Sequence, residues 1–331
     1  MNRRYANLRI EALSNLAGPA ALGAAVILLP KEASAASASL PLTVTAGGAQ
    51  WQLVNNTSGY TAGMSSAARG LGLRDATLVG PPIRHDAYDG AFVMAVNGTI
   101  FKNPTGSVDL TGTTVASGTV VMQGLTVSEQ FYFDTATPTV RAVYTYANPS
   151  ASAITVTVGW SHNFGSDLTT QIVTTSSGDT TLDAADRWVI TSDGDPTGDP
   201  VLSFVRYGPG ATALPTLAAT PVSGFPSDLF ADHYSLTVPA GQTRRLMFFG
   251  QLSQTAGAAE ASAVTFNSNA TLVSSGLLNG LTAQQESEIV NWNFGAPGGV
   301  APVPGTFALV LIAILLGAAV MRFLKWPLPS R

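Results

Sequence analysis

Polar and apolar residues alternate with a period of two through the middle of the chain. Within residues 125–134 every second position from Leu125 is mainly apolar, and similar alternations begin at Val140 and at Ile154. Alternation with β-branched and aromatic residues is typical of strands that bury one face. An Asn-Pro-Ser turn at 148–150 separates the last two segments. The pattern therefore predicts three adjacent antiparallel strands.

Weaker signals of the same kind surround this block. They predict further strands at 51–54, 91–97, 119–123, 169–174, 188–191, 201–207, 233–238 and 245–252. Helical patterns come late, at 258–266 and after a capping-box sequence from Thr282 to Gln285, where a helix is expected to reach Trp292. Strands followed by short helices predict a mainly β fold, a large antiparallel β-sandwich with short C-terminal helices. The strand count leaves open whether this sandwich is the curved double sheet called a supersandwich.

The N-terminal end carries a different pattern. A basic lead that includes Arg3 and Arg4 precedes an apolar stretch at 16–29, and small residues follow up to Ala38. This order is typical of a secretory signal peptide, so residues 1–38 are predicted to be a signal peptide and the protein to be exported. An uncleaved N-terminal anchor is the alternative. Residues 39–294 are left as the β-sandwich domain.

A second apolar segment lies at the other end. A linker rich in glycine and proline, 295–305, leads into residues 306–331, where an uncharged run is followed by Arg322 and Lys325. About 18 helical residues give about 27 Å, close to the thickness of a bilayer's hydrocarbon core. We predict a single transmembrane helix, with the basic flank of Arg322 and Lys325 on the inner side of the membrane. A buried core helix is the alternative.

The linker ends in the motif Pro302-Val303-Pro304. Motif, apolar helix and basic end together resemble the PEP-CTERM class of bacterial C-terminal sorting signals, in variants with an apolar residue between the prolines. The resemblance implies an exosortase-like membrane enzyme as a partner. It also implies a protein that is either anchored in the membrane facing the periplasm or sorted to the cell surface. A plain membrane anchor without cleavage is the alternative.

A second resemblance extends over residues 147–292. This part is similar to a module that recurs in large exported bacterial surface proteins, and the resemblance implies extracellular display without assigning any catalytic residue. The motifs that carry it are Ala147-Asn148-Pro149, 163–167, 175–179, 186–188, 199–200, 238–243 and 289–292.

Composition narrows the partners and excludes some chemistry. The chain has no cysteine, so disulfides and cysteine-ligated zinc are excluded. Charged residues make up 11% of the chain and the net charge is −4, without a basic patch that carries aromatic residues. Nucleic acid is therefore not expected as a partner.

An acidic loop is one candidate for metal binding. Asp193, Asp195 and Asp199 alternate with glycine, proline and threonine. Closely spaced oxygen ligands suit calcium, which would be the only cofactor that the sequence suggests. Aspartates in such loops also form Asx-turns or face solvent, and that is the alternative interpretation.

A carbohydrate-binding surface is the other candidate. Trp160, His162, Arg187 and Trp188 combine aromatic rings with polar groups, as a glycan-binding face requires, which would make a polysaccharide the partner. No catalytic residue is assigned, although Glu129 is the carboxylate to test for catalysis because it falls on the apolar face of its strand. We interpret the chain as a non-enzymatic exported protein of the envelope or extracellular matrix. The alternative is a carbohydrate-binding or carbohydrate-modifying β-sandwich.

Overall fold

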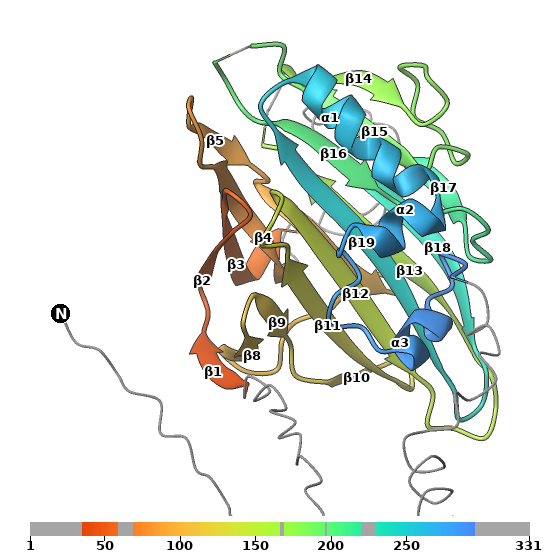
Figure 1. Ribbon diagram of the computed structural model, residues 1–331. Helices are drawn as coiled ribbons and strands as arrows, with labels where there is room; N and C mark the ends of the chain where they lie inside the picture. The colour runs from red at the N-terminus through yellow and green to blue at the C-terminus, as the bar shows by residue number, and fades with distance from the viewer. Residues whose placement is uncertain (1–34, 59–68, 166–168, 196, 220–228, 295–331) are drawn as a thin grey trace, which may run out of the picture. The chain divides into compact units, whose positions relative to one another are not determined.

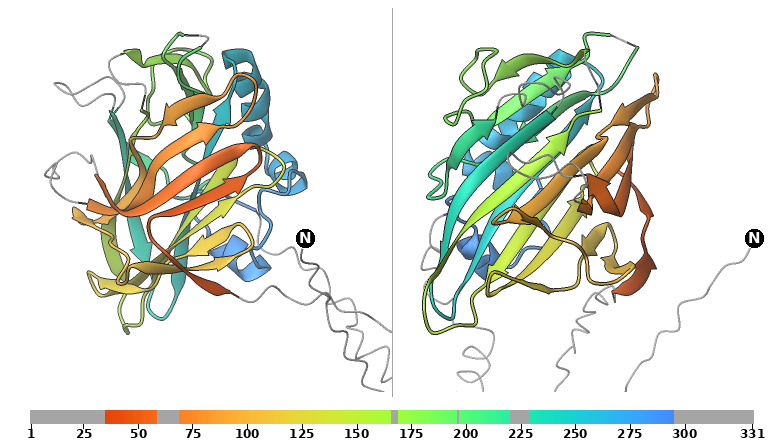
Figure 2. Two further views of the ribbon diagram at one scale, coloured as in Figure 1. Left: turned by 90° about the vertical axis from the view of Figure 1, so that its left-hand side faces the viewer. Right: turned by 180° about the vertical axis from the view of Figure 1, so that it is seen from behind.

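The fold is a sandwich of two antiparallel β-sheets (Figure 1). The structure is a computed structural model that describes residues 35–58, 69–165, 169–195, 197–219 and 229–294. Within these residues the mainly β fold expected from the alternating pattern is confirmed. The two sheets lie face to face and short helices cover one outer side (Figure 2).

The first sheet has ten strands among the described residues and is called the ten-stranded sheet. The long strands β12 and β19 pair along nine residues near its middle. In spatial order its strands are β1 (Ala36–Ser39), β8 (Ser107–Thr111), β9 (Thr114–Ala116), β11 (Leu125–Phe133), β12 (Thr139–Ala147), β19 (Thr243–Ser253), β16 (Val201–Val205), β15 (Trp188–Ser192) and β14 (Gln171–Thr175), with β10 (Val120–Met122) paired to β11.

The second sheet has nine strands within the described ranges and is called the nine-stranded sheet. Its order is β17 (Pro215–Ala219), β18 (Leu229–Val238), β13 (Ile154–Asn163), β6 (Gly90–Val96), β4 (Arg69–Leu78), β3 (Ala49–Ser58) and β2 (Leu42–Ala46), with β5 (Arg84–Ala87) on β4 and β7 (Thr99–Ile100) on β6.

The predicted three-strand block is correct in its strands and wrong in one pairing. Strands β11 and β12 are antiparallel neighbours, but β13 belongs to the opposite sheet. The turn between β12 and β13 is a crossover, held by the Asn148 amide, which donates to the carbonyls of Ser152 at 2.8 Å and Val238 at 2.9 Å. A strand that buries one face alternates in the same way in either sheet, so the pattern cannot show the change of sheet.

Three α-helices and a 3₁₀ turn lie on the outer face of the ten-stranded sheet (Figure 1). The capping box at Thr282 and Gln285 is present, but its helix ends at Glu288 rather than Trp292. None of the helices in the described ranges is long and apolar enough to span a bilayer, and the predicted segment 306–331 lies outside those ranges. The elements are α1 (Ala256–Ala263), η2 (Val264–Asn267), α2 (Asn269–Ser274) and α3 (Ala283–Glu288).

Residues 289–294, called the strap, follow α3 and run along β19. Val290 donates to the Arg245 carbonyl at 3.0 Å, beside the part of β19 that β16 does not reach. The Asn291 amide oxygen accepts from the Met247 amide at 2.8 Å, and the Trp292 indole donates to the Met247 carbonyl at 2.9 Å. These bonds satisfy an otherwise open strand edge, which explains why the helix gives way to extended chain.

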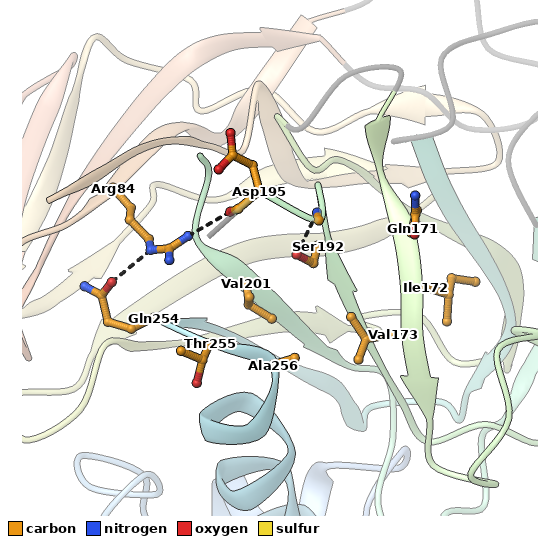
Figure 3. A pocket seen from close by; sticks show the side chains of 11 residues that line it. Arg84, Gln171, Ile172, Val173, Ser192, Asp195, Val201, Gln254, Thr255 and Ala256 are labelled. Carbon is orange, nitrogen blue, oxygen red and sulfur yellow. Dashed lines mark hydrogen bonds between the residues drawn. The ribbon is translucent and has the colours of Figure 1, made fainter. Parts of the chain in front are cut away.

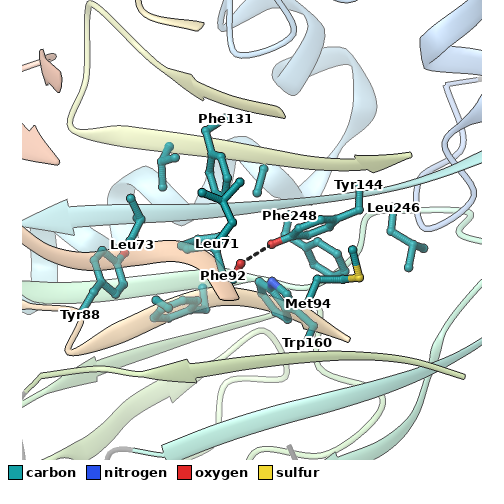
Figure 4. Close-up of a cluster of buried hydrophobic side chains, with 14 of the residues drawn as sticks. Leu71, Leu73, Tyr88, Phe92, Met94, Phe131, Tyr144, Trp160, Leu246 and Phe248 are labelled. Carbon is teal, nitrogen blue, oxygen red and sulfur yellow. Dashed lines mark hydrogen bonds between the residues drawn. The ribbon is translucent and has the colours of Figure 1, made fainter. Parts of the chain in front are cut away.

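Two apolar clusters result. The interior cluster fills the space between the sheets and is dense in aromatic rings, with Trp160 stacked on Phe248 at 4.0 Å between ring centroids (Figure 4). The helix-side cluster lies under the helices, where Phe249 and Trp292 meet edge to face at 5.6 Å. Alternate residues of β19 therefore serve two cores, because successive side chains of a strand point to opposite faces.

Candidate functional site

A pocket of about 340 Å³, called the Arg84 pocket, opens where β5, the β14–β15 end of the ten-stranded sheet and the start of α1 meet (Figure 3). Its volume falls at the lower end of the range typical of small-molecule sites. Aliphatic side chains form one part of the lining, namely Ile172, Val173 and Val201. Polar groups form another, namely Arg84, Gln171, Ser192, Asp195, Gln254 and Thr255.

Arg84 organises this pocket from beneath. Its side chain is only 4% exposed. The guanidinium Nε donates to the Gln254 Oε1 at 2.9 Å, and Nη1 donates to the Asp199 carbonyl at 3.0 Å. The Gln254 amide in turn donates to the Pro82 carbonyl at 2.9 Å. One buried cation therefore joins the two sheets at the base of the acidic loop.

The acidic loop at 193–199 closes on its own backbone. Asp193 accepts from the amides of Asp195 at 2.9 Å and Asp199 at 3.0 Å, and Asp195 accepts from the Thr197 amide and hydroxyl, both at 2.8 Å. The hydrogen bonds from Thr197 hold the pKa of the Asp195 carboxyl below its usual range, so this exposed group stays ionised at neutral pH.

These contacts favour the Asx-turn interpretation over the calcium interpretation. Within the described residues no three acidic or histidine side chains are arranged to hold a metal ion. The carbonyls of Asp195 and Asp199 accept hydrogen bonds from the Arg84 guanidinium, so a cation already lies against two oxygens of the loop. Of these aspartates, Asp195 lines the Arg84 pocket.

The predicted glycan-binding face is not assembled. Trp160 and His162 are 0% exposed and lie in the interior cluster. Trp188 points to the opposite side of the ten-stranded sheet, into the helix-side cluster, where its indole and the Arg187 guanidinium both donate to Asn267. The expectation is wrong because aromatic residues within an apolar alternation occupy the buried face of a strand, where no ligand reaches them.

The His162 side chain instead supports the backbone of β6. Its Nδ1 accepts from the Phe92 amide at 3.1 Å, while the Tyr144 hydroxyl donates to the Phe92 carbonyl at 2.9 Å. Phe92 has a φ of +58°, a backbone conformation that costs a bulky residue about 1–3 kcal/mol and needs such support. Burial lowers the pKa of His162 well below its usual range, so the ring is neutral.

Glu129 is also enclosed. Its side chain lies between the sheets, 2% exposed, and neither carboxyl oxygen has a hydrogen-bond partner among the described residues. Burial raises the pKa of the Glu129 carboxyl well above its usual range, so it holds a proton at neutral pH. An acid sealed in this way contacts no substrate, and no arginine in the described ranges forms a salt bridge with it.

Sequence reasoning located the acidic loop but not the side chains that make it part of a pocket. Arg84 and Gln254 are 170 positions apart in sequence, and nothing in their neighbourhoods indicates that they meet. The sorting motif Pro302, Val303 and Pro304 and the basic flank of Arg322 and Lys325 lie outside the described residues.

Comparison with known proteins places the chain in no family. No family model matches it, and no curated protein does. Among solved structures, the Slr1438 protein from Synechocystis sp. PCC 6803 has a TM-score of 0.39 at 11% identity, covering 65% of this chain and 96% of that one.

A galactose mutarotase-like protein from Lactobacillus casei has a TM-score of 0.37 at 8% identity, covering 64% of this chain and 99% of that one. A polysaccharide lyase has a TM-score of 0.39 at 12% identity, covering 65% of this chain and 34% of the lyase. At these scores and identities the similarities assign neither a family nor a function.

Proposed function

We propose that the protein is a non-enzymatic exported β-sandwich that binds carbohydrate in the Arg84 pocket. The observation that carries this proposal is the lining of the pocket, where an ionised carboxylate and neutral hydrogen-bonding groups surround aliphatic side chains. A sugar presents both hydroxyl groups and an apolar ring face, and a pocket of this composition complements both.

The polar rim is available for a ligand. No hydrogen bond of the Gln171 amide to the described residues is found, and the Ser192 hydroxyl accepts a single bond, from the Gly194 amide at 3.1 Å. Asp195 offers a charged acceptor for sugar hydroxyls, and hydrogen bonds to charged groups are about twice as strong as neutral ones.

The lining favours binding over catalysis. Asp195 is the only carboxylate among the residues that line the Arg84 pocket, and no histidine, lysine or tyrosine accompanies it. Glycoside hydrolysis usually requires two carboxyl groups that flank the bond. A lone ionised aspartate supports recognition of hydroxyl groups.

Carbohydrate binding is tested on a glycan array with the full-length protein in mild detergent, followed by titration of the strongest ligand. Asp195→Asn and Gln171→Ala should each weaken binding about tenfold, because each removes a direct hydrogen bond to the ligand. Asp109→Asn, at an exposed position of β8, is the matched control. Binding that survives both pocket variants unchanged would exclude this site, and release of a new sugar product would show an enzyme.

Export and sorting complete the proposal. We propose that the residues before β1 direct export, so that the predicted leader ends at Ala35 rather than at Ala38, because Ala36–Ser39 pair with β8. We also propose that residues 302–331 tether or sort the protein through an exosortase-like enzyme. Deleting 302–331 should move the protein from the membrane fraction to the periplasm or medium. Intact-mass measurement of the mature protein separates the two outcomes. A C-terminus near Pro304 supports sorting, whereas one at Arg331 supports a plain anchor.

A further inference from the structure

A second pocket, called the Arg69 pocket, lies on the nine-stranded sheet and shares no lining residue with the Arg84 pocket. It has a volume of about 280 Å³ and lies between the ends of β3 and β4. Its lining is mostly polar, formed by Val54, Asn56, Thr57, Arg69, Arg74 and Asp89.

Two register shifts in one strand pair form this pocket. Between Gln52 and Leu53 on β3 the partner strand advances by two residues, from Asp75 to Leu73, so Arg74 is the extra residue on β4. Between Val54 and Thr57 the partner advances only from Gly72 to Gly70, so β3 carries the extra residue beside Asn56. Bulges redirect side chains and are common next to functional sites.

One polar side chain at these bulges is held in place by a hydrogen bond, and two others have none to the described residues. The Arg69 Nη1 donates to the Asn56 carbonyl at 3.2 Å, which holds that guanidinium at the pocket. Neither the Arg74 guanidinium nor the Asn56 side-chain amide hydrogen-bonds to any of the described residues. Both are exposed to solvent, whereas Thr57 is buried and its hydroxyl bonds to the Gly72 carbonyl.

Charge indicates the class of ligand. Two arginines and one aspartate line the pocket, which gives a net charge of +1. The planar guanidinium fork matches the two oxygens of a carboxylate, and a singly charged group balances this pocket better than a doubly charged phosphate. The Asn56 amide supplies both a donor and an acceptor for a neighbouring hydroxyl.

We propose that the Arg69 pocket is a binding site for an acidic sugar, with Arg69 and Arg74 on its carboxylate and Asn56 on a ring hydroxyl. The inference goes beyond the proposed function, since it requires neither the Arg84 pocket nor export.

The test is a ligand-observed NMR titration of the full-length protein in detergent at constant ionic strength, with sodium glucuronate, glucose and inorganic phosphate as separate probes. Glucuronate should bind more tightly than either of the others. Arg74→Gln should weaken glucuronate binding about tenfold, because it removes a charged hydrogen bond from an exposed side chain. Arg244→Gln removes the same charge from β19 and should leave binding unchanged.

The variant Asp89→Asn should have the opposite effect on the affinity for glucuronate. It removes the negative charge from the pocket lining, so glucuronate should bind more tightly, whereas a variant that merely damaged the fold would bind less. Equal binding of glucuronate and glucose would overturn the proposal, as would an Arg74→Gln protein that binds like the wild type. Tighter binding of phosphate than of glucuronate would overturn the assignment to a carboxylate. Because Asp195→Asn leaves this pocket intact, the two proposals can fail separately.

Discussion

Two of the buried acids, Asp232 and Glu129, lie in opposite surroundings. Asp232, on β18, receives two hydrogen bonds of 2.6 Å from the Arg206 guanidinium, and both side chains are 0% exposed. Burial alone would lower the pKa of Arg206, but the adjacent carboxylate outweighs this and raises it. Glu129, in the ten-stranded sheet, has no partner among the described residues and remains neutral.

The difference shows how a buried acid can be accommodated in two ways. Arg206 also donates to the carbonyls of Asp183 at 2.5 Å and Asp186 at 2.8 Å, so the pair with Asp232 ties the 183–186 turn to the nine-stranded sheet. Glu129 avoids a charge by keeping its proton. The first arrangement fixes structure, and the second makes stability depend on pH.

The largest expected effect on stability comes from breaking the ion pair between Arg206 and Asp232. Asp232→Leu should destabilise the protein by about 3–5 kcal/mol, because it leaves the Arg206 charge buried without a counter-ion. Urea unfolding of the full-length protein in detergent measures this. Adding Arg206→Met should recover part of the loss, since the stranded charge is then gone. Additive losses in the double variant would contradict this account.

Glu129 should produce a smaller, pH-dependent effect. The folded state keeps a proton that the unfolded chain releases above about pH 4.3, so the free energy of unfolding falls as pH rises toward the folded pKa. The slope due to this group is about 1.4 kcal/mol per pH unit. Glu129→Gln removes this slope. Urea unfolding between pH 5 and 8 should show that the free energy of unfolding of the variant increases relative to that of the wild type as pH rises. A constant difference would indicate that Glu129 does not titrate on unfolding.

Two buried tyrosines allow the same comparison between a paired and an unpaired polar group, here without charge. Tyr144 and Tyr146 lie on the same face of β12 and are 0% exposed, but only Tyr144 has a hydrogen-bond partner among the described residues, the Phe92 carbonyl. Tyr144→Phe should cost about 1 kcal/mol, whereas Tyr146→Phe should cost nothing or stabilise the protein slightly. Thermal unfolding compares the two, and equal losses would contradict the assignment of the bond.

Calcium should have the smallest effect on stability. The carboxylates of Asp193 and Asp195 accept backbone amides, and Arg84 occupies the carbonyl side of the loop. Millimolar calcium should therefore leave the melting temperature unchanged relative to a chelator, because only a ligand of the folded state raises it. A rise that disappears after Asp193→Asn would restore the calcium interpretation.

Strands with strict alternation were predictable, whereas β4, which two glycines interrupt, was not. The patterns at 125–134 and 140–146 correspond to the antiparallel pair β11 and β12. Strand β4 was missed because Gly70 and Gly72 break its pattern. A side chain at Gly70 would lie 2.3 Å from the Phe101 carbonyl, and one at Gly72 would lie 2.6 Å from the Ala91 carbonyl. Close approach between segments requires these glycines, and no local pattern reveals such contacts.

Of the sites, the loop at 193–199 was visible in the sequence because its acidic residues are adjacent. Its neighbours in the Arg84 pocket come from β5, β14 and the start of α1, so their convergence depends on the sheet order. The Arg69 pocket depends on two bulges, which shift register by single residues and leave no distinct composition. Trp160 and His162 were misplaced because they were judged by residue type, although they continue the apolar alternation of β13 and so lie on its buried face.

The strap has a mechanical consequence. A force applied to the chain beyond residue 294 reaches the domain through the strap. Its residues Asn291 and Trp292 are hydrogen-bonded to Arg206, Met247 and Gly208. The Trp292 ring occupies the space that a side chain at position 208 would need, so it is wedged as well as bonded. Tension on this segment is shared among these contacts and passes through Met247 into β19. The hydrogen bonds and packing of the strap therefore resist detachment of residues 289–294 from the domain.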